Sequence, residues 1–245
     1  MNRKYVKNKG LHIGLIMDGN GRWATQQGQP RLYGHAFGVQ TVIDVVRECP
    51  TLDVYTVTLF AFAIANWKRD KQEVDGLWSL FYEFITNSSK ELLDEGVCIT
   101  FIGDRTGLPK KIQSAIEKLE SDSRENNSLL LQVALNYDGI DEVARMIKKI
   151  IVDKVSAEEI DTQYVLNHLD TQKGNDPDII IRTGMEKPRE GMSLWRSSAF
   201  LPLQSVQSVC VSTAVLWPDF SVAHLKEIIE YAKPDKRLFG GQRRE

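Results

Sequence analysis

Residues 11–23 read Leu-His-Ile-Gly-Leu-Ile-Met-Asp-Gly-Asn-Gly-Arg-Trp. The first part, Leu11 to Met17, is an apolar run rich in branched side chains, which is typical of a buried strand. The run ends at Asp18 and passes into a turn that contains Gly19 and Gly21. Ligands of open α/β sheets gather at the carboxyl ends of the strands, so this turn is the first candidate for a functional site.

Four further apolar runs have the residue types of buried strands: Val54 to Phe62, Val97 to Ile102, Leu129 to Leu135, and Asp178 to Arg182. Apolar residues recur at helical spacing in five segments: Gly34 to Glu48, Gln72 to Glu95, Pro109 to Leu119, Glu142 to Val155, and Val222 to Ala232. This alternation predicts a parallel sheet covered on both faces. We therefore expect residues 1–245 to form a single α/β domain with a central, mainly parallel sheet flanked by helices. Residues 184–199 fit neither pattern and predict a long loop over a functional edge.

The composition is that of a chain able to bury a core, because 42% of its 245 residues are hydrophobic and 26% are charged. Its 31 Lys and Arg residues nearly balance 33 Asp and Glu residues. The resulting formal charge of -2 argues against a protein that coats nucleic acid or an anionic membrane. Three widely spaced cysteines argue against a disulfide scaffold or a structural zinc site. The sequence has neither a signal-peptide pattern nor a bilayer-spanning apolar run, so we expect a cytoplasmic protein with no membrane span.

The turn after the first strand has the residue types of an anion-binding site. Backbone N–H groups at the start of a helix attract anions, and glycines let that backbone approach an anion closely. Arg22 and Arg31 would add charge-assisted donors. Asp18 would hold Mg²⁺ against the same anion, because hard cations prefer carboxylate and phosphate oxygens. The alternative interpretation is a tight Asp-Gly turn with surface arginines. The turn is neither a Walker A nor a Gly-x-Gly-x-x-Gly motif.

Residues 12–24 closely resemble the first motif of the cis-prenyltransferase family, of the undecaprenyl diphosphate synthase type. Later stretches resemble the family's other motifs in the family's order: Arg31 to Gly38, Leu59 to Phe62, Asn66 to Arg69 with Glu73 and Val74, Phe101 to Asp104, Leu135 to Gly139, Pro177 to Gly184, and Leu216 to Phe220. Several motifs in order are more specific than any single one. The resemblance implies an enzyme that joins isoprenoid diphosphates, uses Mg²⁺ as its cofactor and forms a homodimer.

The resemblance also implies a role for each matching residue. Asp18 would position Mg²⁺ on the allylic diphosphate, and Asp18, His35 and Asn66 would form the catalytic set. The implied substrate-binding residues are Gly19, Asn20, Gly21, Arg22, Trp23, Arg31, His35, Asn66, Trp67, Arg69, Arg182, Arg196 and Ser198. Of these, Arg182, Arg196 and Ser198 would hold the second diphosphate. The helix predicted over residues 72–95 would wall a hydrocarbon tunnel with Trp78, Phe81 and Phe84. Capping or ordinary packing is the alternative interpretation for His35, for Asn66 and for the aromatic side chains.

The chain departs from the family pattern at positions that, by the resemblance, would bind the acceptor substrate. Ala63 and Ala65 stand where the family's Ser-x-Glu-Asn-Trp motif has a hydroxyl and a carboxylate. Val209 stands where the family has a metal-coordinating Glu, Ala214 replaces an Asp, and the loop between Arg182 and Arg196 is longer than usual. These losses fall where isopentenyl diphosphate would bind and lose its proton, whereas the stretch from Asp18 to Arg31 is intact.

The one-sided loss favours an irregular reaction, the head-to-middle coupling of two dimethylallyl diphosphates to a short-chain branched or cyclised diphosphate. Lavandulyl and cyclolavandulyl diphosphate synthases, which this pattern resembles, carry out such couplings. One alternative is ordinary cis chain elongation with isopentenyl diphosphate. Another is a non-catalytic subunit that stabilises an active prenyltransferase, which the retained Asp18, Arg22 and Arg31 argue against. The tail from Lys233 would either fold over the active site or be a solvated terminus.

Overall fold

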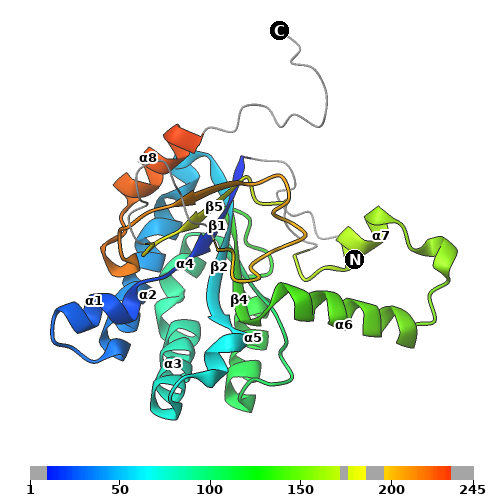
Figure 1. Ribbon diagram of the computed structural model, residues 1–245, viewed down its shortest axis with the longest axis horizontal. Coiled ribbons are helices and arrows are strands. Elements are labelled where there is room, and N and C mark those ends of the chain that lie inside the picture. Colours follow the sequence, from blue (N-terminus) through cyan, green and yellow to red (C-terminus); the bar gives the residue numbers. More distant parts are fainter. Residues whose placement is uncertain (1–9, 172–175, 186–195, 233–245) are drawn as a thin grey trace, which may run out of the picture.

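The computed structural model describes residues 10–171, 176–185 and 196–232. Six strands form one sheet in the order β3-β4-β2-β1-β5-β6, and each neighbouring pair is parallel (Figure 1). The strands are β1 (Leu11–Ile16), β2 (Val54–Ala63), β3 (Val97–Ile102), β4 (Leu129–Tyr137), β5 (Ile179–Arg182) and β6 (Val209–Ser212). The chain leaves β1 toward β2 and later returns to β1's other side at β5, so the strand order reverses beside β1. Such a reversal opens a crevice at the carboxyl ends of the strands.

Helices connect the strands. The α-helices are α1 (Asn20–Gln26), α2 (Arg31–Glu48), α3 (Lys71–Glu83), α4 (Lys90–Asp94), α5 (Lys110–Asp122), α6 (Gly139–Val152), α7 (Thr162–His168) and α8 (Val222–Ala232). The short 3-10 turns are η1 (Cys49–Leu52), η2 (Ile64–Lys68), η4 (Ala157–Glu159) and η5 (Trp217–Asp219). A π-helical turn, η3 (Phe84–Ser88), continues α3 toward α4.

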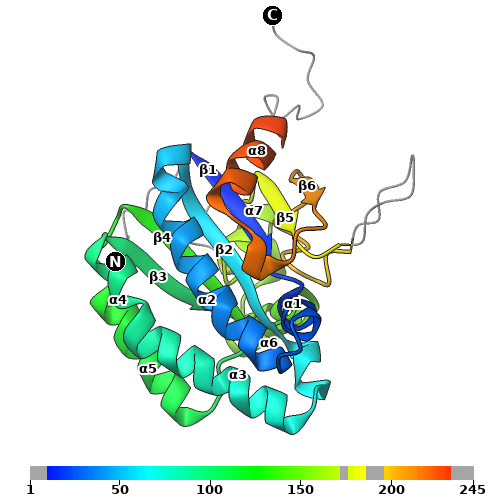
Figure 2. The same cartoon turned by 90° about the vertical axis from the view of Figure 1, so that its left-hand side faces the viewer.

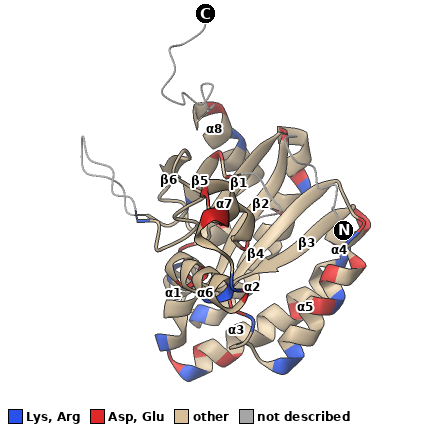
Figure 3. Ribbon diagram, turned by 90° about the vertical axis from the view of Figure 1, so that its right-hand side faces the viewer, with Lys and Arg blue, Asp and Glu red and all other residues tan. Residues whose placement is uncertain are grey.

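The larger core lies between one face of the sheet and the helices α2, α3 and α5 (Figure 2). In α5, Ile112, Ile116 and Leu119 are buried at helical spacing, whereas the charged Lys111, Glu117 and Lys118 are exposed. Figure 3 shows charged residues along both α3 and α5. Burial of one apolar stripe with a charged opposite side is what holds an amphipathic helix on a sheet. These helices therefore fix the first turn of α3 and the start of α2 beside the carboxyl end of β1.

A smaller core lies on the opposite face, around Phe60, Tyr137, Phe200 and Leu201. The ring of Phe200 packs over β1, where a Cβ atom on Gly14 would lie 3.0 Å from that ring. Helices α6 and α7 lie on this side of the molecule and extend beyond the edge of the sheet (Figure 1). This second core anchors the segment from residue 196 next to the carboxyl end of β5.

The five predicted strands are all present, and the expectation of a mainly parallel sheet is confirmed. Strand β3 has the predicted bounds, and β4 continues to Tyr137. Helix α6 begins at Gly139, earlier than predicted, because Asp138 caps it by accepting hydrogen bonds from the backbone N–H groups of Ile140 and Asp141.

The helix predicted over residues 72–95 is confirmed in extent, but it is not one regular α-helix. The chain forms α3, the π turn at Phe84–Ser88 and then α4. Apolar spacing continues across the π turn, so it gave no sign of the break. The strand β6 and the helices α1 and α7 lie outside the predicted elements, because they are short and have little apolar periodicity.

The predicted loop over residues 184–199 lies mostly outside the described residues, as does the tail from Lys233. None of the helices in the described ranges is both long enough and apolar enough to cross a bilayer.

Candidate active site

The carboxyl ends of β1 and β5 bring a carboxylate, that of Asp18, next to the guanidinium of Arg182. These strands pair in parallel with Ile16 opposite Arg182, so Arg182 ends its strand beside the turn that follows β1. Asp18 Oδ2 accepts a hydrogen bond from Arg182 Nη2 at 2.8 Å, and Asp18 Oδ1 accepts one from Arg22 Nη2 at 3.2 Å. Thr183 donates its hydroxyl to the Asp18 carbonyl at 2.8 Å. The Asp18 carboxylate therefore lies between two guanidinium groups that come from different parts of the chain.

The turn after Asp18 needs glycine at position 19, and the Arg31 side chain packs against it at Gly21. Gly19 has a φ of 109°, and a side chain there would also meet Leu216 at 2.8 Å. At Gly21, a Cβ atom would lie 2.5 Å from Arg31 Cζ and 2.7 Å from each terminal nitrogen of Arg31. The Arg31 guanidinium thus lies directly against the backbone of the turn, and α1 begins at Asn20 in the same turn.

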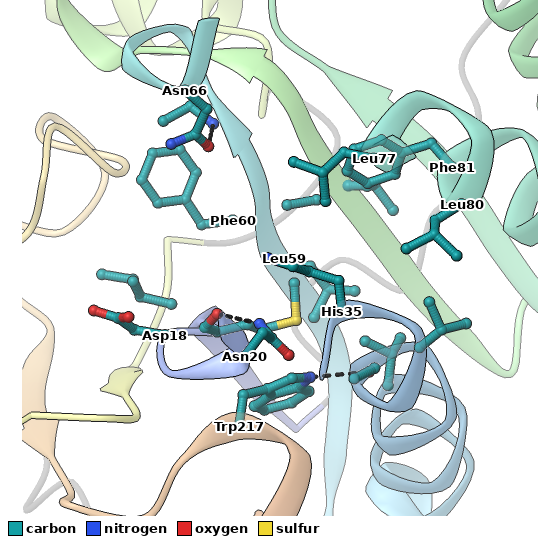
Figure 4. Close-up of a pocket in the computed structure, with 18 of the residues that line it drawn as sticks. Asp18, Asn20, His35, Leu59, Phe60, Asn66, Leu77, Leu80, Phe81 and Trp217 are labelled. Atoms are coloured by element: carbon teal, nitrogen blue, oxygen red, sulfur yellow. Dashed lines mark hydrogen bonds between the residues drawn. The ribbon is translucent and has the colours of Figure 1, made fainter. Parts of the chain in front are cut away.

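A cavity of about 260 Å³ opens beside this turn (Figure 4). Its polar lining contains seven of the predicted site residues: Asp18, Asn20, His35, Asn66, Arg69, Arg182 and Ser198. Its apolar lining includes Val39, Val42, Leu59, Leu77, Leu80, Phe81, Phe84 and Val133. In Figure 4, Leu77, Leu80 and Phe81 lie on the side opposite Asp18. One end of the cavity can bind an anion, and the other end suits a hydrocarbon.

A second charged group lies where the starts of α2 and α3 meet. Glu73, in the first turn of α3, accepts from Arg31 Nε at 3.1 Å and from Arg69 Nη1 at 3.0 Å. His35 Nε2 lies 4.0 Å from Glu73 Oε1. Burial, with the positive charges of Arg69 and Arg31, lowers the pKa of His35 to about 4, and Glu73 opposes that shift. His35 is therefore a neutral imidazole at physiological pH, available as a hydrogen-bonding group.

Two of the predicted substrate-binding residues, Trp23 and Trp67, make contacts outside the cavity. Trp23 donates its indole N–H to Asp219 at 2.7 Å and packs on Tyr33 and Phe37. Trp67 donates to Asn136 at 2.7 Å and packs on Phe62 and Trp78. Neither tryptophan lines the cavity. Their contacts are those of side chains that fix neighbouring elements.

The predicted tunnel aromatics divide in the same way. Phe81 and Phe84 line the cavity, whereas Trp78 is buried in the packing around Phe62. Asn66 lines the cavity, but its side-chain oxygen accepts from the backbone N–H of Ala63 at 3.0 Å, so Asn66 also fixes the turn after β2.

The predicted second-diphosphate residues gather around Arg182. Arg182 Nη1 donates to the Arg196 carbonyl at 2.5 Å and to Ser198 Oγ at 3.1 Å. The Arg182 side chain is 14% exposed, and its Nε is buried without a hydrogen-bond partner in the described part of the chain. A buried guanidinium with an unused donor beside a polar cavity is suited to an anionic ligand.

The chain lacks the hydroxyl and the carboxylates that the family pattern has at positions 63, 65 and 209, and the described cavity lining is poor in acidic side chains. Ala63 lines it, Ala65 is exposed, and Val209 starts the edge strand β6 with 38% exposure. Among the described lining residues, Asp18 is the one carboxylate.

The residues present could hold Mg²⁺ through Asp18 together with the phosphates of a substrate. The described residues contain no group of three or more His, Cys, Asp and Glu side chains that would enclose a metal ion. Asp18, however, is 38% exposed at the polar end of the cavity, next to cationic groups that suit phosphate. Mg²⁺ commonly binds through one or two carboxylates together with substrate phosphates, and Asp18 meets that requirement.

Sequence reasoning missed the part played by Glu73. The residue appeared only as one position of a motif, because an acidic side chain in the first turn of a helix is also expected from the helix dipole alone. Trp217, whose indole N–H donates to the Gly38 carbonyl at 2.9 Å at the cavity wall, was likewise quoted only within a motif.

Comparisons with known proteins show the family of this chain. Residues 16–240 match a family model described as "Putative undecaprenyl diphosphate synthase". The isoprenyl transferase of Clostridium perfringens is 40% identical over 235 residues, which cover 94% of this chain and 89% of that protein. The isoprenyl transferase of Aquifex aeolicus is 37% identical over 229 residues, which cover 94% of this chain and 95% of that protein.

Two solved structures have the same fold. Lavandulyl diphosphate synthase from Lavandula x intermedia, in complex with dimethylallyl diphosphate, superposes with a TM-score of 0.86 at 26% identity, covering 95% of this chain and 99% of that one. A probable undecaprenyl diphosphate synthase from Campylobacter jejuni superposes with a TM-score of 0.77 at 26% identity, covering 96% of this chain and 100% of that one. The matches extend over the strands and helices that form the cavity.

Proposed function

Because the chain belongs to the undecaprenyl diphosphate synthase family of prenyltransferases, we propose that it elongates an allylic diphosphate with isopentenyl diphosphate. The single observation that carries this proposal is the cavity itself, which has Asp18 and Arg182 at one end and an apolar wall from α3 at the other. The names of its sequence relatives support elongation more than the irregular coupling that the sequence pattern favours.

In this proposal, the turn from Gly19 to Arg22, together with Arg31, holds the allylic diphosphate. An allylic carbon–oxygen bond breaks readily only when the charge of the departing pyrophosphate is stabilised, and two guanidiniums with backbone N–H groups provide fixed donors for that charge. When bound through Asp18, Mg²⁺ would supply further charge stabilisation at the pyrophosphate oxygens. Arg182, with Arg196 and Ser198, orients the second diphosphate, so that its double bond faces the allylic carbon.

A second candidate function rests on a separate observation. The acceptor side has Ala63 in the lining and no carboxylate other than Asp18 among the described lining residues. That environment favours a second dimethylallyl diphosphate as acceptor, in the irregular coupling expected from the sequence. The superposition on lavandulyl diphosphate synthase supports the same alternative.

Two incubations with Mg²⁺ separate the candidates. For elongation, purified protein given dimethylallyl diphosphate, or a longer allylic diphosphate, plus isopentenyl diphosphate should form linear products that mass spectrometry detects. Dimethylallyl diphosphate alone should then give nothing. A branched or cyclic ten-carbon diphosphate from dimethylallyl diphosphate alone would establish the irregular reaction and refute elongation as the main activity. Absence of product from both incubations would contradict both.

A homodimer and a cytoplasmic location remain predictions. For the dimer, α6 offers an exposed apolar stripe, because Ile140, Ile147 and Ile151 are 69%, 48% and 70% exposed and recur at helical spacing. A second copy of the same stripe is a self-complementary partner for it. Light scattering should give twice the chain mass for the wild type and the monomer mass for Ile151→Lys. A monomeric wild type would refute the dimer.

A further inference from the structure

Glu73 lies beside the two arginines at the start of α2 and α3. Asp70 caps α3 by accepting from the backbone N–H of Gln72 at 2.8 Å. A glutamate in the third helical position commonly turns back toward the capping residue. Glu73 instead uses one carboxylate oxygen for Arg31 and the other for Arg69, at 3.1 and 3.0 Å. The side chain therefore joins two helix starts through two cations.

The contact with Arg31 uses one particular nitrogen. Glu73 accepts from Arg31 Nε, and within the described residues the terminal nitrogens Nη1 and Nη2 of Arg31 have no hydrogen-bond acceptor. Those terminal nitrogens lie against Gly21, as the close approach to its hypothetical Cβ atom shows. Glu73 is 15% exposed and Arg31 is 52% exposed. The half-buried carboxylate thus contacts the Nε edge of the guanidinium and leaves the edge formed by Nη1 and Nη2 facing the turn.

The Glu73 carboxylate offsets the repulsion between Arg31 and Arg69, but its charge works against the binding of an anion. A carboxylate beside an anion-binding turn repels the anion, so simple Coulomb attraction would favour a neutral residue at this position. The geometry gives a different reason, because a long arginine side chain loses conformational freedom when it binds a phosphate. An arginine that is already oriented loses less of that freedom on binding.

We propose that Glu73 is a positioning residue that orients Arg31 and Arg69 for the pyrophosphate group of the allylic substrate. This inference rests on the proposed function in one respect, namely that Arg31 and Arg69 bind a diphosphate. It extends that function by assigning a task to a residue that lies outside the cavity lining.

The test measures how tightly the full-length protein binds inorganic pyrophosphate, by isothermal titration calorimetry in magnesium-free buffer well below the melting temperature. Glu73→Gln keeps the shape of the side chain and removes its charge. Electrostatics alone predicts that this variant binds the anion more tightly. Positioning predicts the opposite sign, and we expect affinity to fall at least about fivefold, with Glu73→Asp between the variant and the wild type.

Glu120→Gln is the matched control. Glu120 is also a partly buried glutamate, 21% exposed, and its carboxylate binds Arg105 at 2.6 Å. It does not line the cavity. We expect this variant to bind pyrophosphate within about twofold of the wild type.

A further pair of variants covers the case in which Glu73→Gln alone is poorly folded. When Arg31 and Arg69 are both changed to Ala, Glu73 has no arginine left to position, so adding Glu73→Gln should leave the affinity equal or raise it. A fall of the same size in this background would overturn the proposal.

The outcomes are separable from the test of the reaction. Equal or tighter pyrophosphate binding by folded Glu73→Gln would overturn the inference, as would a wild type that binds no pyrophosphate. If the wild type binds pyrophosphate and Glu73→Gln weakens that binding, the inference stands even when the prenyl transfer incubations give no product. In that case only the proposed reaction fails.

Discussion

Asp18 and Arg182 lie at the ends of neighbouring parallel strands, and Asp18 Oδ2 accepts a hydrogen bond from Arg182 Nη2 at 2.8 Å. Arg22 binds the other carboxylate oxygen. The acid thus partly neutralises two cations that the proposed reaction needs. A substrate diphosphate would compete for those cations and release Asp18 toward a metal ion.

Asp18→Ala should therefore abolish turnover and leave the fold intact. We expect kcat to fall at least about a hundredfold. Without Asp18, Mg²⁺ would lose the carboxylate that holds it beside the leaving pyrophosphate, and the charge of that group would be less stabilised. Steady-state kinetics and circular dichroism measure the two effects. Asp75→Ala is the control, since Asp75 is a 61% exposed acid paired with Lys71, and it should keep wild-type kcat. Full activity of Asp18→Ala would show that the metal assignment is wrong.

His35 should make stability depend on pH. Its pKa is lowered from 6.5 to about 4 in the folded chain, chiefly by burial. As the pH falls from 6.5 to 4, His35 becomes protonated in the unfolded chain but stays neutral in the folded chain. The free energy of unfolding therefore decreases in that pH range, and His35 causes no decrease above it. The loss is on the order of 3 kcal/mol for a shift of this size.

Urea unfolding at pH 6.5 and pH 4.5 measures this effect. His35→Gln removes the titrating ring, so its stability should fall less than that of the wild type between the two pH values. Equal losses in the two proteins would mean that His35 takes up its proton at an ordinary pKa.

Trp67→Phe should affect stability more than substrate binding. The change removes the hydrogen bond to Asn136 and part of the packing on Trp78, at a cost of about 1 kcal/mol. Because Trp67 does not line the cavity, KM for both diphosphates should stay within about twofold of the wild-type value. A tenfold rise in KM would instead support the substrate-binding role that the family resemblance implies.

Phe84→Ala should lengthen the product. Phe84 is 7% exposed and closes part of the apolar end of the cavity. Removing the ring leaves space for further carbon atoms and costs about 3 kcal/mol of stability, so products are best analysed at low temperature. The control is Trp78→Phe, which alters a buried neighbour outside the cavity lining. An unchanged product length for Phe84→Ala would place the end of the chain elsewhere.

The sequence predicts the buried strands well because they are apolar on both faces, as the uniform burial of β3 and β4 shows. The edge strand β6 is exposed or half-buried along its length, so it lacks that pattern. A strand of this kind is defined by its pairing with β5 and not by its composition.

The sequence also predicted that Asp18 and Arg182 lie close together, since Asp18 follows one strand and Arg182 ends another, and the structure brings them into contact at the candidate site. The directions of side chains could not be predicted. Trp23 and Trp67 turn toward Asp219 and Asn136, which are distant in sequence, and no local pattern encodes such a contact. The same holds for Glu73, whose partner Arg31 lies on a different helix.

The π turn at Phe84–Ser88 has a consequence for how this helix can vary in length. Such a turn accommodates one surplus residue, and each residue of an α-helix rotates the following ones by about 100°. Because the turn absorbs that surplus residue, deleting a single residue here should restore a regular α-helix and leave Leu92 of α4, now fully buried, against the sheet. A one-residue deletion should therefore be tolerated inside the π turn and not elsewhere in α3 or α4, where it would rotate the following residues by about 100°.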